Sequence, residues 1–127
     1  MIFQQLLSEI QKLRLEEQRA QTEDYLEAVI SKESLDSLHM VLTAYFGPPL
    51  KPEGQAPSGQ IQQQAAPFGG IRKDQTMYAR QEGSHFAYAV LWPWGSGVRI
   101  TLKVVRSRGS TQAFGLKVFF DNLFRHK

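Results

Sequence analysis

Apolar residues follow a helical spacing in the first part of the chain. Intervals of three and four separate Phe3, Leu6, Leu7, Ile10 and Leu13, which is the pattern of one helix face. A polar run over residues 16–24 interrupts this stripe, and apolar positions resume at 25–30. Because the polar run is rich in strong helix formers, the pattern favours one continuous helix over residues 2–31. The alternative is two helices that separate near residues 21–22, with Thr22 as the N-cap of the second.

A further helix is predicted between Ser34 and Gly47. Ser34 suits an N-cap, Gly47 can adopt the left-handed conformation that ends a helix, and two prolines then forbid its continuation. The core-facing stripe of this helix consists of Leu35, Leu38, His39, Leu42, Tyr45 and Phe46. Residues 1–47 are therefore predicted to be helical.

Residues 48–74 form a connection rich in proline, glycine and glutamine. A structureless loop of this length is uncommon inside a compact domain and is usually functional or disordered. We expect its middle part to be disordered, while Ile61, Phe68 and Ile71 could hold parts of it to the surface.

An antiparallel β-meander is predicted over residues 75–106. Its strands are expected near 75–82, 85–92 and 98–106, separated by glycine-containing turns. Both faces of the second strand are apolar, so this strand should be central and covered on both sides. In the third strand Val98, Ile100, Leu102 and Val104 alternate with Arg99, Thr101 and Lys103, which predicts one buried face and one wet, basic face.

The C-terminal residues 110–125 favour a helix, although a strand is the alternative. Lys117, Asp121 and Arg125 would form a polar stripe with i, i+4 spacing on that helix. The apolar positions that suit the opposite side of the helix are Ala113, Leu116, Phe120, Leu123 and Phe124. The whole pattern predicts a single α+β domain over residues 1–127, with N-terminal helices on one face of a three-stranded antiparallel meander and a helix at the C-terminus.

Composition indicates the cellular compartment in which this domain is expected. The chain has no cysteine, which excludes disulfides and thiolate chemistry and favours a reducing compartment. It shows neither a signal peptide nor an apolar run long enough for a membrane span, so we expect a cytoplasmic protein. Charge is uneven, because residues 1–47 carry 4 basic and 8 acidic residues whereas residues 48–127 carry 11 and 4.

No residue pattern predicts catalysis or a cofactor. The three histidines, at 39, 85 and 126, lack metal-ligand spacing. His85 and Glu82 could meet across a turn, but such a pair is ordinary there. We therefore expect no catalytic residue, metal or cofactor, and an enzyme of unknown class is only the second alternative.

Protein binding is the leading functional hypothesis. Trp92 and Trp94 stand at one end of the meander near Arg99 and Lys103, a composition typical of interface hot spots. The stripe Phe3, Leu6, Leu7, Ile10 and Leu13 has no assured partner in so small a fold, so we expect it to form a homodimer contact. The protein is thus predicted to be a non-enzymatic homodimer that binds another protein. The first alternative is nucleic-acid binding through the basic strand face.

Overall fold

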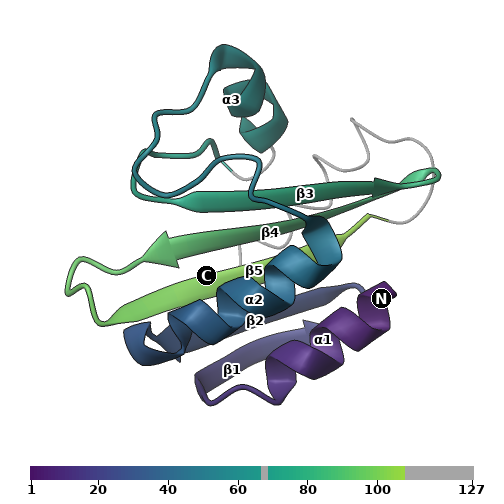
Figure 1. The fold of residues 1–127 in the computed structure, drawn as a ribbon, viewed down its shortest axis with the longest axis vertical. Coiled ribbons are helices and arrows are strands. Elements are labelled where there is room, and N and C mark those ends of the chain that lie inside the picture. The colour runs from purple at the N-terminus through teal and green to yellow at the C-terminus, as the bar shows by residue number, and fades with distance from the viewer. Residues whose placement is uncertain (67–68, 108–127) are drawn as a thin grey trace.

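The computed structural model of the protein describes residues 1–66 and 69–107. Its centre is a five-stranded antiparallel sheet with the strand order β1-β2-β5-β4-β3 (Figure 1). The strands are β1 (Leu15–Thr22), β2 (Tyr25–Ser31), β3 (Thr76–Glu82), β4 (His85–Pro93) and β5 (Arg99–Arg106). The helical elements are α1 (Phe3–Gln11), η1 (Lys32–Ser34), α2 (Leu35–Phe46) and α3 (Gly59–Ala65).

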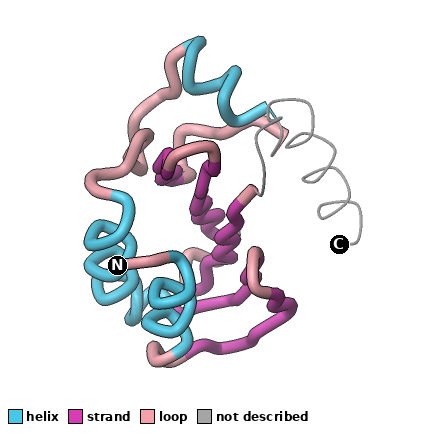
Figure 2. The backbone as a smooth tube through the Cα atoms, turned by 90° about the vertical axis from the view of Figure 1, so that its right-hand side faces the viewer, coloured by secondary structure: helices cyan, strands magenta, loops and turns pink. Residues whose placement is uncertain are grey.

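Helices α1 and α2 pack on the same side of the sheet, as Figures 1 and 2 show. We call this side the helix-covered face. Its core is formed by apolar side chains of α1 and α2 against alternate residues of the strands, among them Leu26, Ile30, Ala89, Leu102 and Val104. The α+β class and the prediction that helices cover one face are therefore confirmed.

The apolar stripe of α1 lies inside this core. Phe3, Leu6, Leu7 and Ile10 are almost completely buried, and Leu13 packs against the same cluster. The stripe therefore has its partner within its own chain. The unpaired surface on which the homodimer contact was expected does not exist.

The predicted helix over residues 2–31 is wrong beyond α1. Residues 15–22 and 25–31 form the antiparallel pair β1–β2, and the turn between them contains Glu23 and Asp24, whose amide donates a hydrogen bond to Thr22 Oγ1. Every residue from Tyr25 to Ile30 is buried. A strand explains this burial because successive side chains point to opposite faces and both faces are covered.

The meander strands occur where they were predicted, but the predicted three-stranded sheet is wrong. Strand β5 pairs with β4 on one side and with β2 on the other, so it is the middle strand of five. Consequently its second face is not wet, because Thr101 and Lys103 are both buried. Val98, expected inside, precedes the strand and is exposed.

The long connection is more ordered than predicted. Helix α3 begins after Ser58, whose Oγ accepts a hydrogen bond from the amide of Ile61. Lys51 is fully buried and bridges to β3 at Met77. Ile61 and Ile71 do pack on the sheet, as expected, whereas Phe68 and the predicted C-terminal helix over 110–125 lie outside the described residues.

Candidate functional site

The two tryptophans stand at the end of the sheet where β4 turns into β5. We call the side of the sheet opposite α1 and α2 the second face. The strand register places alternate residues of β2, β5 and β4 on it: Tyr25, Glu27, Val29, Thr101, Lys103, Val105, Tyr88, Val90 and Trp92. Trp94 Nε1 donates a hydrogen bond of 2.8 Å to Thr101 Oγ1. The Arg19 guanidinium lies 5.8 Å from the Trp94 ring centroid. Trp94 is thus folded back toward the second face and held there, yet 37% of it is exposed.

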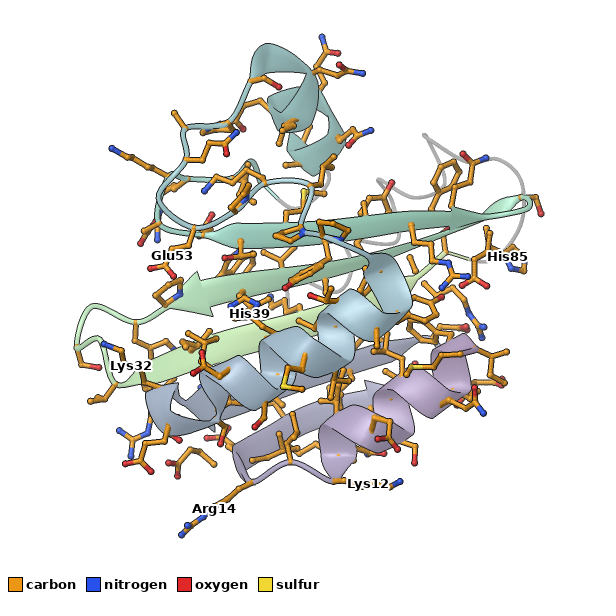
Figure 3. The ribbon with its side chains drawn as sticks, viewed as in Figure 1. Lys12, Arg14, Lys32, His39, Glu53 and His85 are labelled. Carbon is orange, nitrogen blue, oxygen red and sulfur yellow. The ribbon has the colours of Figure 1, made fainter. Side chains whose placement is uncertain are left out.

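Exposed side chains surround Trp94 at this turn. Val98 is 53% exposed, and Arg99 is also exposed. The Lys32 amide donates a 2.9 Å hydrogen bond to the Val98 carbonyl, which ties the end of β2 to the turn. Figure 3 shows Lys32 at this same end of the sheet. We define Trp94, Val98 and Arg99 as the hairpin patch.

Trp92 faces a different environment from Trp94. It is half-buried and helps to line a cavity of about 500 Å³ between the sheet and the α3 segment. The Gln62 amide fixes the opposite wall, because its Nε2 donates to the Ile71 carbonyl at 2.8 Å and its Oε1 accepts from the Ile71 amide at 3.2 Å. The other lining residues are Gly69, Gly70, Arg72 and Gln75. This cavity was not anticipated from the sequence, because it depends on how the long connection folds back.

Lys103 is not the surface residue that its alternation with apolar residues suggested. Its ammonium nitrogen lies 4.3 Å from the centroid of the Trp92 ring, within the range of a cation–π interaction. Only 1% of the residue is exposed. Of the four predicted partner-binding residues, the structure therefore brings Trp92 and Lys103 together in the interior and leaves Trp94 and Arg99 on the surface.

A buried acid belongs to the same region and was missed from the sequence. Glu27 lies directly opposite Lys103 in the β2–β5 register and is buried. Its Oε1 accepts a 2.7 Å hydrogen bond from the Tyr25 hydroxyl, and its Oε2 lies 3.6 Å from Arg19. Burial raises the pKa of Tyr25, and the bond to Glu27 raises it further. Glu27 and Arg19 were overlooked because both were assigned to the continuous helix predicted over residues 2–31.

His39 and His85 are the two histidines within residues 1–66 and 69–107, and they belong to different elements, α2 and β4. His39 Nδ1 lies 2.6 Å from the Tyr78 hydroxyl, so this histidine of the core-facing stripe of α2 has a hydrogen-bond partner. Glu82 and His85 are opposite each other across the β3–β4 turn, and Glu82 accepts a hydrogen bond from Tyr45. No cluster of three or more potential metal ligands occurs in this part of the chain.

Comparison with family models, curated proteins and solved structures finds no match to this chain. Function must therefore be argued from the residues themselves. Among the described residues, no helix has the length and apolar character needed to cross a membrane.

Proposed function

We propose that the protein is a non-enzymatic binding or assembly module that recognises another protein through the hairpin patch. The observation that supports this proposal is the state of Trp94, which is held in place and yet accessible. Tryptophan and arginine are the residue types that most often dominate binding energy at protein interfaces. Here Trp94 and Arg99 are exposed beside the apolar side chain of Val98.

The fixed orientation of Trp94 favours binding on energetic grounds. Ordering a free side chain at an interface costs about 0.5–1.5 kcal/mol. The Thr101 hydroxyl and the Arg19 guanidinium already restrict the indole. Much of the side-chain entropy is therefore lost during folding and not during binding. The ring can therefore present its exposed part with little further loss of entropy.

Charge around the patch indicates the chemistry of the partner. Arg99 and Lys32 are exposed cations at this end of the sheet. A segment that places an acidic residue beside an apolar one would complement them and cover Trp94 and Val98. Nucleic-acid binding has less support from the structure than from the sequence. It was expected to use the basic face of the third strand, but Lys103 and Thr101 on that face are buried.

A homodimer contact through α1 is not part of the proposed function. The apolar stripe of α1, on which the homodimer was predicted, is buried in the protomer. The hairpin patch is exposed within a single chain, so a different protein could bind it without dimerisation. We therefore propose a partner surface at the β4–β5 turn alone.

The decisive experiment compares proteins that co-purify with the wild-type chain and with two variants. We expect Trp94→Ala to lower recovery of a specific partner by about tenfold or more, as for a hot-spot residue. The matched control is Met40→Ala, which removes an apolar side chain that is 75% exposed on α2. Equal recovery with all three chains, measured by quantitative mass spectrometry, would reject the hairpin patch as the binding surface.

A further inference from the structure

The cavity beside Trp92 has the size and the walls of a small-molecule site. Its volume of about 500 Å³ lies within the roughly 300–1,000 Å³ that is usual for ligand pockets in proteins. The buried residue Ile71 and the half-buried Trp92 supply apolar surface, and Gln75 and Arg72 add a small number of polar groups. Arg72 and Gly69 are exposed, so the cavity is open to solvent on their side.

The wall formed by residues 69–75 is held in place by side chains of the protein itself. Gln62 bonds to one amide and one carbonyl of this segment. Gln75 Oε1 accepts a 2.8 Å hydrogen bond from the Arg72 amide. The Lys51 ammonium donates to two further carbonyls of the same segment. A ligand therefore meets a preformed wall and does not have to supply the free energy that would order it.

Two adjacent glycines shape the same wall. Gly69 and Gly70 both have a φ of 91°, a backbone conformation that residues with a side chain rarely adopt. A Cβ atom on Gly70 would lie 3.3 Å from Gln62 Oε1, the oxygen that accepts the hydrogen bond from the Ile71 amide. The shape of the cavity thus depends on glycine at these positions.

The charge of the cavity favours an anionic ligand. Arg72 is the one charged residue among the described residues that line it. The Arg72 Nε atom lies 3.3 Å from Asp74 Oδ1, but the two side chains are 70% and 56% exposed. An ion pair with this exposure contributes little to stability, so the guanidinium can exchange Asp74 for an anion that enters the cavity.

We propose that this cavity binds a small planar aromatic anion, whose ring packs on Trp92 and whose carboxylate or phosphate pairs with the Arg72 guanidinium. Aromatic rings contact each other favourably in offset-stacked or edge-to-face arrangements, and the planar guanidinium matches both carboxylate and phosphate. None of the hairpin-patch residues is among the described residues that line the cavity. The proposal is therefore independent of the proposed protein-binding function.

The two tryptophans of the chain permit a direct test by nuclear magnetic resonance. An isotope-labelled sample of the full chain gives two indole N–H signals, which a Trp94→Phe sample assigns. On titration with 2-naphthoate we expect the Trp92 signal to shift with a dissociation constant below about 1 mM, and the Trp94 signal to shift much less. Cyclohexanecarboxylate, an anion without an aromatic ring, should bind at least about threefold more weakly.

A matched pair of variants tests the role of the guanidinium. Arg72→Met should weaken 2-naphthoate binding about fivefold or more, because it removes a charge-assisted hydrogen bond. The same variant should leave binding of the neutral 2-naphthalenemethanol unchanged. The control is Arg14→Met, which removes an exposed arginine at the opposite end of the molecule from α3 (Figure 3). Both variants alter exposed side chains, so both should fold, as judged by circular dichroism.

A second probe separates the two kinds of anion. Tighter binding of 2-naphthyl phosphate than of 2-naphthoate would assign a phosphate ligand, and the reverse order a carboxylate. Either order supports the proposal. An unchanged Trp92 signal at about 5 mM 2-naphthoate, well above the expected dissociation constant, would overturn it. Equal shifts of the two indole signals, or equal affinities of Arg72→Met and Arg14→Met, would overturn it as well.

Discussion

Glu27 and Lys103 lie directly opposite each other on the neighbouring strands β2 and β5, and both are enclosed. Glu27 is 8% exposed and Lys103 is 1% exposed. Opposed residues in an antiparallel pair have Cβ atoms about 5 Å apart. Around them, the Tyr25 hydroxyl donates to Glu27 and the Trp92 ring lies against Lys103. Opposite charges at the centre of an otherwise apolar face can offset part of the cost of burying each one.

This relationship predicts coupling between the two positions. Lys103→Met should lower the free energy of unfolding by about 2–4 kcal/mol, because the buried Glu27 carboxylate then keeps only Arg19 as a neighbouring cation. The double variant Glu27→Gln with Lys103→Met should recover at least about 1 kcal/mol relative to the sum of the single effects. Urea unfolding of the four chains gives the coupling. Additive losses would mean that the two charges are stabilised independently of each other.

The helical prediction for β1 and β2 failed for reasons that lie in the sheet. Strand β1 is an edge strand with mostly exposed residues, and register shifts follow Leu15 and Gln18. Such irregularities remove the alternation that marks a strand in sequence. In β2, Tyr25, Leu26, Val29 and Ile30 imitate a helical stripe because both faces of the strand are covered. In contrast, the caps and breakers of α2 were local signals, and α2 begins and ends where they predicted.

The candidate site was predictable only in its surface part. Trp94 was identified because a turn forces it outward, and Arg99 because it alternates with apolar residues in the predicted third strand. Neighbouring residues in the sequence reveal both constraints. The burial of Lys103 depends on β5 pairing with β2, about 70 residues earlier in the chain. The cavity beside Trp92 depends on Gln62 bonding to Ile71 across the long connection. Such long-range pairings have no local signature, so the sequence pattern alone suggested a wet face.

Leu6→Ala distinguishes a core role for α1 from a role in dimerisation. Leu6 is fully buried in the helix-covered core, so the change should lower the free energy of unfolding by about 2–5 kcal/mol. The loss should be independent of protein concentration, as measured by denaturant unfolding across a dilution series. A shift of the sedimentation coefficient with unchanged stability would instead support a contact between chains.

Lys51 anchors the long connection to the sheet. Its ammonium donates hydrogen bonds to the carbonyls of Lys73 and Gln75, and its backbone pairs with Met77. Burial lowers the pKa of Lys51, partly opposed by Asp74 and Glu53. Lys51→Met keeps an apolar stem of similar length but removes the donors, so the two carbonyls lose a partner. We expect a loss of about 1–3 kcal/mol and faster amide hydrogen exchange at residues 51 and 77.

Lys73→Met is the matched control for this substitution. The Lys73 side chain is exposed, and only its carbonyl takes part in the anchor, so the change should alter stability by less than about 0.5 kcal/mol. Equal effects of the two substitutions would show that the hydrogen bonds of Lys51 do not hold the connection in place.

Three of the four buried tyrosines have raised pKa values, which predicts a loss of stability at high pH. Burial raises the pKa of Tyr25, Tyr78 and Tyr88 above the ordinary value of 10.0. Between pH 10 and these raised values the folded chain binds more protons than the unfolded chain. Stability is therefore fully present below about pH 10 and declines above it, by up to about 1.4 kcal/mol per pH unit for each tyrosine.

Absorbance at 295 nm and far-UV circular dichroism, recorded together, check this prediction. In the folded chain the three phenols should remain protonated above pH 10 and ionise only as the secondary structure is lost. In denaturant they should ionise near pH 10. Tyr25→Phe removes the group that combines burial with the hydrogen bond to Glu27, so its stability should decline less steeply with pH. If all three phenols ionise near pH 10 while the dichroism is unchanged, the tyrosines are not enclosed as the structure places them.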